Sequence, residues 1–293
     1  MDQGYGAWPE CEFTSDEIDW KTAAHITAGV DIGTTSSQAA IMCDGVLFGY
    51  SNMRTGVDFR ETANAVIQKA FGKSGMTLDN VETVIGTGFG RRNISYATKY
   101  KDEVHCHAKG ARFLFGPDVR TVVNIGGQTA TAIRLYDWDR VWDFFHNDRC
   151  ATGMGRGIEM LCDILHIPLV EIGEKSLDIT DEPFQVSTTC HAFAATETLG
   201  LFGRPEYKEK PLCENEVYAS YMFAVAWRIL GMIGKLQPLD VGEIAVYKEL
   251  GFTGGLAKNP GITKRIEREL NVKALNSSYD PQLAGAIGAA LLA

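Results

Sequence analysis

Hydrophobic positions in the first third of the chain fall in short runs that end in glycine, which is the pattern of buried strands followed by tight turns. The first run is HITAGVDIG at 25–33. It continues as SSQAAIMCDGVLFGYSNMR, which predicts two further strands around a turn at 43–45. VETVIGTGFGRR at 81–92 predicts another strand that runs into a glycine turn. The region therefore has the polarity pattern of a sheet.

Apolar residues at helical spacing alternate with these strands. FRETANAVIQKAFGKSG at 59–75 predicts a helix with a glycine stop signal, and HAKGARFLFG at 107–116 predicts a shorter one. Further helical patterns fall at 153–166, 190–202 and 214–235, from the glycine turn in 252–262 to about Leu270, and in the small-residue stretch from 281. Strands that alternate with helices place the chain in the α/β class.

The opening pattern returns 93 residues later. VDIGTTSSQAA at 30–40 aligns with VNIGGQTATAI at 123–133, and the identical pairs are Val30/Val123, Ile32/Ile125, Gly33/Gly126 and Ala39/Ala132. The alternative is a chance match between short strand-plus-glycine segments. Duplication predicts two lobes of similar build. We expect an N-terminal extension at 1–24, lobe I at 25–117 completed by 281–293, and lobe II at 118–280.

Composition narrows the class of protein. The length of 293 residues suits two lobes, and 45% hydrophobic with 22% charged residues is ordinary for a globular chain. The net charge of −9 argues against nucleic-acid binding, which needs a basic face. The longest apolar stretch is interrupted by Arg228 and Lys235, so no membrane span is expected. The acidic N-terminus lacks the apolar segment of a secretory signal, and we expect a cytoplasmic protein.

The glycine turns carry the first candidate chemistry. Turns rich in Gly, Thr and Ser present backbone N–H groups and hydroxyls to an anion, and Asp31 at a strand end suits Mg²⁺ held through water. A third turn, Gly254–Gly255, allows close approach of a nucleoside. No Walker sequence is present, and GTGFGRR has Arg91 where a dinucleotide fingerprint needs glycine. Each glycine turn alone could have a purely structural role. The three turns together, in this order, predict a polyphosphate that is bound between two lobes.

The same segments resemble a known superfamily. VDIGTTSSQAAI, VNIGGQTATAI and FTGGLAKNPGI are similar to the two phosphate motifs and the adenosine motif of actin/hexokinase/Hsp70-like ATPases. More narrowly, the chain resembles the ATPase family of 2-hydroxyacyl-CoA dehydratase activators and benzoyl-CoA reductase ATP-binding subunits. The supporting stretches are GTGFGRR, EVHCHAKGA, NDRCATGMGR, TTCHAFAATE and PQLAGAIGAAL. The resemblance implies two duplicated RNase H-like lobes around a cleft for ATP and Mg²⁺.

The resemblance also implies roles for individual residues. Asp31 would hold Mg²⁺ and take part in catalysis, and Gln128 would position water. The residues expected to contact the phosphates are Gly33, Thr34, Thr35, Gly126, Gly127 and Gln128, and those expected to line the nucleoside pocket are Gly254, Gly255 and Lys258. Activators of the family usually read DIGGQD at the second turn, whereas this chain has Asn124 and Thr129. We expect weaker metal binding or slower hydrolysis, with ATP binding retained by the backbone amides.

Two of the seven cysteines stand in family motifs: Cys150 in NDxCAxGxGR and Cys190 in CxxFAxxE. An odd, scattered set of cysteines makes a disulfide framework unexpected. A [4Fe–4S] cluster usually takes four thiolates, so one chain supplies half a site and a second copy or a paralogue supplies the rest. Both cysteines precede helical segments, whose positive N-termini favour thiolate. Buried free cysteines are the alternative.

The remaining cysteines are expected in the core: Cys11, Cys43, Cys106, Cys162 and Cys213. Cys106 lies between His105 and His107, but three adjacent ligands point in different directions, which disfavours a metal site there.

We expect the chain to be the ATP-hydrolysing, cluster-bearing subunit of an anaerobic benzoyl-CoA reductase for aromatic degradation. It would pass electrons from ferredoxin to ring-reducing subunits. The aromatics of 1–24 would supply a permanent partner surface, and a disordered tail is the alternative for this segment. ATP turnover would change lobe closure and move the helices after Cys150 and Cys190. The alternatives are a separate activator of a 2-hydroxyacyl-CoA dehydratase, a sugar-type kinase, and a nucleotide-sensing module without turnover.

Overall fold

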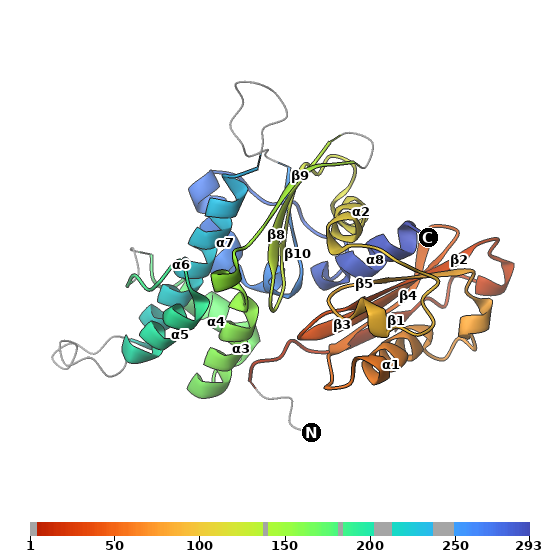
Figure 1. The fold of residues 1–293 in the computed structure, drawn as a ribbon, viewed down its shortest axis with the longest axis horizontal. Helices are drawn as coiled ribbons and strands as arrows, with labels where there is room; N and C mark the ends of the chain where they lie inside the picture. Colours follow the sequence, from red (N-terminus) through yellow and green to blue (C-terminus); the bar gives the residue numbers. More distant parts are fainter. Residues whose placement is uncertain (1–4, 137–139, 181–183, 202–212, 237–248) are drawn as a thin grey trace.

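The computed structural model describes residues 5–136, 140–180, 184–201, 213–236 and 249–293, and its elements form two lobes (Figure 1). The strands are β1 (Cys11–Thr14), β2 (Ile26–Ile32), β3 (Ser36–Cys43), β4 (Val46–Arg54), β5 (Thr83–Thr87), β6 (Lys99–Tyr100), β7 (Thr121–Ile125), β8 (Ala130–Leu135), β9 (Val141–His146) and β10 (Leu250–Thr253). The α-helices are α1 (Phe59–Phe71), α2 (Glu103–Phe115), α3 (Met154–Leu165), α4 (Leu169–Ser176), α5 (His191–Gly200), α6 (Glu214–Ile233), α7 (Pro260–Leu270) and α8 (Ala284–Leu291). Within these ranges, no helix combines the length and apolar character that crossing a membrane requires.

The two sheets are built on one plan. The first has the order β1-β4-β3-β2-β5-β6 and the second β10-β7-β8-β9. In each lobe a central strand (β2 or β7) pairs antiparallel with the next strand of a meander and parallel with a later strand (β5 or β10). The meander β2-β3-β4 of the first lobe therefore corresponds to β7-β8-β9 of the second.

Helices separate and cover the sheets. Helix α1 packs on β2, β3 and β4, whereas α8 contacts β2, β3 and β5, and α2 contacts the strands of the second sheet. In Figure 1, α2 and α8 lie between the two sheets, and α3 to α7 lie beyond β8 and β10. The largest hydrophobic core fills the space between these last helices and the second sheet. The cleft-forming ends of the strands are thus held by cores on both sides.

Helix α8 packs at backbone distance, as its small residues predict. A Cβ added to Gly29 of β2 would lie 1.9 Å from the Ala286 carbonyl oxygen, and one added to Gly288 would lie 1.8 Å from that of Cys106. Glycine at these points lets α8 approach both the first sheet and α2. Because α8 follows the lobe II residues in sequence, the chain returns to lobe I at its end.

Several bounds differ from those predicted. Helix α1 ends at Phe71 because Gly72 adopts φ +57°. Helix α2 begins at Glu103, since the Asp102 side chain accepts a hydrogen bond from the His105 backbone N–H and caps the helix. Strands β1 and β9 and helix α4 were not predicted at all. Each has a short or mixed pattern that becomes regular only against its neighbours.

Candidate functional site

A cleft between the lobes collects most of the predicted site residues. Those that line it are Asp31, Gly33, Thr34, Thr35, Gly126, Gly127, Gln128, Gly254 and Gly255. The cleft lining does not include Lys258, Cys150 or Cys190. Asn124 and Thr129, the two departures from the family sequence, also line it. Three turns that are far apart in sequence therefore face one space.

The turn at 33–36, which joins β2 to β3, is called turn I, and the turn at 126–129, which joins β7 to β8, is called turn II. Turn I is braced by Thr55, whose backbone N–H donates to the Thr35 carbonyl (3.0 Å) and whose hydroxyl donates to the Gly33 carbonyl (3.0 Å). Turn II closes on itself through the Gly126 N–H and the Thr129 carbonyl (2.9 Å). Hydrogen bonds within the chain therefore hold both turns, and turns of this kind can present backbone N–H groups to an anion.

The two turns touch each other across the cleft. A Cβ added to Gly127 of turn II would lie 2.4 Å from Cγ2 of Thr35 in turn I. Only glycine at position 127 permits this approach, so an anion between the turns would meet backbone groups from both lobes. A movement of either turn toward the other would therefore bring Gly127 and Thr35 into collision.

Asp31 lies at the end of β2 and is 7% exposed. Burial, followed by the charge of Glu103, raises the pKa of Asp31 to about 7. His107 Nε2 is 4.0 Å from the Asp31 carboxylate, but burial lowers the pKa of His107 to about 4, so this imidazole is neutral at pH 7. Burial also raises the pKa of Glu103, which lines the same cleft. Two carboxyl groups beside a neutral histidine suit a hard divalent cation.

Glu103 and His107 were not predicted as site residues. They stand four residues apart on α2, so both reach one face of the helix and both line the cleft. The four-residue spacing of Glu103 and His107 in the stretch EVHCHAKGA was the signal that could have identified them.

Turn II is joined directly to the segment that carries Cys150. The Gly153 N–H donates to the Gln128 carbonyl (2.7 Å), and the Arg156 N–H donates to the Gly127 carbonyl (2.9 Å). A Cβ added to Gly155 would lie 2.6 Å from the Gly126 carbonyl oxygen. The first turn of α3 therefore rests on the backbone of turn II.

Cys150 is exposed in a 3₁₀ turn (Arg149–Ala151) that precedes α3, and Cys190 is half-buried at the N-cap of α5. The two helix starts meet, since a Cβ on Gly153 would lie 2.8 Å from Nε2 of His191. Two thiols that are forty residues apart in sequence thus belong to neighbouring helix N-termini.

A buried cation lies beside Cys190. Arg228 of α6 is 8% exposed and donates to the carbonyls of Ser187 and Thr188 (both 2.5 Å). Its Nη1 has no hydrogen-bond partner within the described part of the chain. Burial lowers the pKa of Arg228, and the charge of Cys190 acts in the opposite direction. A cation with a free donor favours an anionic ligand set at this cysteine.

The other cysteines divide into two groups. Cys43, Cys106 and Cys162 are buried as predicted, and burial raises the pKa of Cys106 and of Cys162 to about 12. The prediction was wrong for Cys11, which is half-buried on edge strand β1, and for Cys213, which is exposed at the N-cap of α6. Both stand at element ends, where one side of the residue faces solvent.

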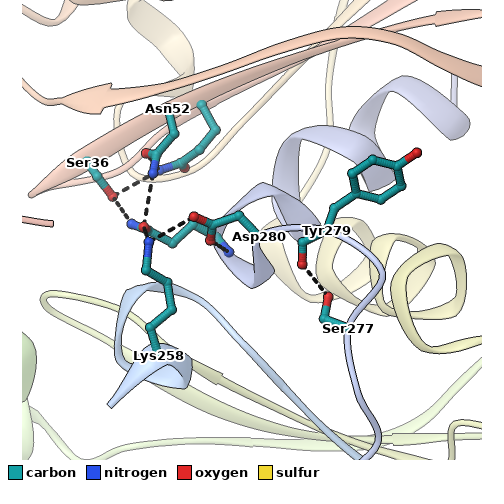
Figure 2. Close-up of polar contacts among 8 residues, drawn as sticks. Ser36, Asn52, Lys258, Ser277, Tyr279 and Asp280 are labelled. Carbon is teal, nitrogen blue, oxygen red and sulfur yellow. Dashed lines mark hydrogen bonds and ion pairs between the residues drawn. The ribbon is translucent and has the colours of Figure 1, made fainter. Parts of the chain in front are cut away.

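Lys258 lies behind the cleft lining rather than on it. Its ammonium donates to Asp280 Oδ2 and to Gln282 Oε1, both at 2.8 Å. Asn52 Nδ2 also donates to Gln282 Oε1 (2.9 Å), which links the lysine to lobe I (Figure 2). The lysine therefore contacts the loop before α8 directly, and it is connected to β4 through Gln282.

The profile of the BadF/BadG/BcrA/BcrD ATPase family matches residues 28–293. The chain belongs to this family. It is 32% identical over 267 residues to a 2-hydroxyisocaproyl-CoA dehydratase activator of Clostridioides difficile, with 91% of this chain and 94% of the relative covered. It is 35% identical over 272 residues to an activator of lactoyl-CoA dehydratase of Anaerotignum propionicum, with 91% and 96% covered.

Solved structures agree. The C. difficile activator with bound ADPNP superposes with a TM-score of 0.78 at 31% identity, with 92% of this chain and 94% of that chain covered. A glucokinase of Streptomyces griseus, at 14% identity and a TM-score of 0.53, shares the fold alone. The two-lobed ATPase fold and the family resemblance are thereby confirmed, and the chain is an ATP-binding member of an ATPase family.

The relatives correct the expected function. They activate 2-hydroxyacyl-CoA dehydratases, so the benzoyl-CoA reductase assignment was wrong and the stated alternative is favoured. The turn and cysteine motifs were assigned both to the dehydratase activators and to the benzoyl-CoA reductase subunits, so they could not distinguish these two groups. The aromatics of 1–24 do not separate the two branches either: Phe13 stacks on Tyr50 and the Trp20 indole N–H donates to the Ser74 carbonyl, while Tyr5 and Phe13 remain partly exposed.

Proposed function

We propose that this chain is the ATP-dependent activator of a 2-hydroxyacyl-CoA dehydratase, and that two copies share a [4Fe–4S] cluster through Cys150 and Cys190. Relatives with near-complete coverage activate such dehydratases in two organisms. The partner is therefore a dehydratase component, and the substrate class is a 2-hydroxyacyl thioester that the partner binds.

One observation carries the proposal: the backbone hydrogen bonds from turn II to the start of α3. The carbonyls of Gly127 and Gln128 are bonded to the helix that follows Cys150, while the opposite side of turn II faces the cleft and Thr35. A change in the occupancy of the cleft that shifts turn II must also shift the helix after Cys150. This arrangement is what an ATPase needs to act on a cluster outside its own cleft.

In the cleft, Asp31 and Glu103 would hold Mg²⁺, which neutralises phosphate charge when it is bound. The amides of turns I and II would orient the phosphate chain from both lobes. Gln128 lines the cleft and would orient water toward the terminal phosphate. Gly254 and Gly255 leave room for the nucleoside, since neither carries a side chain.

At the cluster, Cys150 and Cys190 supply two thiolates from each chain. No group of three or more His, Cys, Asp or Glu side chains among the described residues is arranged to hold a metal. Four thiolates then require two chains related by a two-fold axis. When bound, a [4Fe–4S] cluster supplies one-electron transfer. Cys150 and Cys190 would hold it next to the N-termini of α3 and α5, with the Arg228 cation beside Cys190.

Anaerobic purification with an iron count tests the cluster. Wild-type protein should carry about two iron atoms per chain, the stoichiometry of one cluster per pair. Cys150→Ser and Cys190→Ser should each lose most of the iron and the brown colour. Cys213→Ser is the matched control, because Cys213 is likewise an accessible cysteine at the start of a helix, but it lies outside the two family motifs. This variant should keep the iron. Full iron in both of the first two variants would contradict the proposal.

A coupled assay tests the function. With a dehydratase component, a reductant and MgATP, the chain should switch on dehydration of a 2-hydroxyacyl-CoA, and a non-hydrolysable ATP analogue should not replace ATP. Phosphorylation of a sugar by colourless protein would instead support the kinase alternative, and a cluster without ATP turnover would support the sensing module.

A further inference from the structure

The segment at 5–14 crosses from one lobe to the other, and we call it the strap. At its start, the Leu169 N–H donates to the Tyr5 carbonyl (2.9 Å), and the Gly6 N–H donates to Asp163 Oδ1 (2.9 Å). Gly6 also packs on backbone, since a Cβ there would lie 2.5 Å from the Glu159 carbonyl oxygen. These bonds fix the beginning of the strap to α3 and α4 of lobe II.

The end of the strap is fixed to lobe I. One carboxylate oxygen of Glu10 accepts from the Arg54 N–H (3.1 Å), and the other forms an ion pair with Lys69 (2.7 Å). Residues 11–14 then form β1, which pairs antiparallel with β4 from Cys11 opposite Asn52 onward. The strap is thus anchored at both ends, on different lobes.

Between the anchors, Trp8 and its two neighbours line the cleft. Trp8 lies against the third glycine turn, because a Cβ added to Gly255 would be 3.5 Å from the indole nitrogen. The Lys258 ammonium sits 4.9 Å from the centre of the indole ring and is itself held by Asp280 and Gln282. The indole is therefore held at the Gly254–Gly255 end of the cleft.

The Glu10 carboxylate, which also lines the cleft near Trp8, is not available to a base. Both carboxylate oxygens of Glu10 are already engaged by Arg54 and Lys69. The second aromatic residue of the lining, Phe89, follows Gly88, whose added Cβ would lie 2.2 Å from Asp31 Oδ1. Phe89 therefore belongs to the Asp31 end, where metal and phosphate would lie. Trp8 is left as the aromatic surface at the opposite end.

We propose that Trp8 stacks on the purine base of the bound nucleotide and is a positioning residue for it. This inference rests on the proposed function, which places the nucleoside at Gly254–Gly255. The family profile begins at residue 28, so the strap precedes the matched part of the chain. The base site is then completed by a segment outside the family's common region. Stacking on an aromatic ring suits a base because it depends on the flat π-face.

Calorimetric titration of anaerobically prepared full-length chain tests the stack with two probes, ADP and inorganic pyrophosphate. Trp8→Ala should weaken ADP binding about tenfold, the size of effect that loss of one base–aromatic stack produces. Pyrophosphate binding should stay within about twofold, because turns I and II are unchanged. Trp8→Phe should recover most of the ADP affinity. Trp142→Ala, which removes a half-exposed tryptophan on β9, is the matched control.

Unchanged or tighter ADP binding by Trp8→Ala would overturn the inference, and tighter binding would show that Trp8 occupies the place of the base. Equal losses for ADP and pyrophosphate would show a structural role. Should Trp8→Ala not fold, ADP-induced fluorescence change decides: it should be mostly lost in Trp8→Phe, and a full change in that variant would refute the stack. Wild-type chain that binds neither probe would count against the proposed function itself.

Discussion

Turn I and turn II follow equivalent strands of the two lobes but have different chemistry around them. In each, the residue before the last of the central strand is polar, Asp31 in β2 and Asn124 in β7. In each lobe, a glycine also follows the strand that pairs parallel with the central strand: Gly88 follows β5 and Gly254 follows β10. Both glycines have a left-handed φ, +84° and +85°. An added Cβ would meet Asp31 Oδ1 at 2.2 Å in the first case and Asn124 Oδ1 at 2.5 Å in the second. The two lobes therefore correspond even in which side-chain oxygen lies beside this glycine.

The difference lies in what surrounds each turn. Asp31 is buried beside Glu103 and His107 of α2, which gives lobe I a carboxylate site. Turn II has a neutral amide at the equivalent position and is bonded instead to α3. One copy of the motif thus places a carboxyl group in the cleft, and the other contacts the helix that follows Cys150. The same fold with different surroundings therefore gives the two turns different contacts, and under the proposed function one would bind the cation and the other would move α3.

Asp31→Asn should break the comparison most strongly, because it makes the two lobes chemically alike. Loss of the carboxylate removes a ligand for Mg²⁺, and we expect ATP hydrolysis to fall about 100-fold or more. ADP binding without Mg²⁺ should change little. Steady-state phosphate release measures the first effect and calorimetry the second. Hydrolysis at the wild-type rate would show that the cation is held elsewhere.

Gly155→Ala tests the transmitting side. The added methyl would lie 2.6 Å from the Gly126 carbonyl oxygen and 2.8 Å from Gly127 Cα, so α3 and turn II must separate. We expect an approximately tenfold loss of ATP-dependent dehydratase activation, by analogy with the cost of small misplacements at reacting centres.

The control for that variant is Gly200→Ala on α5, where an added Cβ meets nothing within 4 Å. It should keep activation within about twofold, and both variants should keep their iron. Normal activation by Gly155→Ala would mean that the contact between turn II and α3 carries no signal.

Asn124→Asp restores the acidic residue usual in the family's activators and sharpens the comparison from the other side. A second carboxylate facing the cleft should lower the Mg²⁺ concentration needed for half-maximal hydrolysis by about two- to fivefold, the size of a partly solvated charge interaction. A magnesium titration of ATPase activity measures it. A higher magnesium requirement would indicate that the amide at 124 donates to a phosphate oxygen.

A last effect concerns stability in the absence of ligands, where no chemistry at the cleft is involved. The pKa of Asp31 is raised from 3.8 to about 7, so the folded chain holds this proton more tightly than the unfolded chain does. The contribution of Asp31 to the free energy of unfolding is therefore greatest at low pH. It falls as the pH rises from about 4 to about 7, by at most about 1.4 kcal/mol per pH unit. Urea unfolding of wild type and Asp31→Asn should diverge over this range, with the variant less sensitive. Parallel curves would contradict the buried carboxylate.

Local patterns predicted what depends on neighbours in sequence. The strand ends at Asp31 and Asn124 and the turns after them were readable because each signal lies within a dozen residues. The starts of α3 and α5 were readable for the same reason. The joint role of Cys150 and Cys190 was predicted from motifs and stays a prediction; the structure shows that the helix starts next to them are in contact, through Gly153 and His191.

Features made by distant segments were not readable. Strand β1 reads CEFT, which has no strong pattern and becomes a strand only by pairing with β4. Lys258 was expected on the nucleoside pocket, but its partners Asp280 and Gln282 lie more than twenty residues on. The position of Trp8 depends on anchors on both lobes. These outcomes depend on tertiary contacts that no local window of sequence contains.

The late return of α8 to lobe I has a consequence for how a cell makes this protein. Translation delivers the helices after Cys150 and Cys190 well before residues 284–291, yet β2 and α2 pack against α8 at glycines. The half of the molecule that contains Asp31 can therefore complete its packing only after both of these helices have been synthesised. A nucleotide can be held from both lobes only once residues 284–291 are in place.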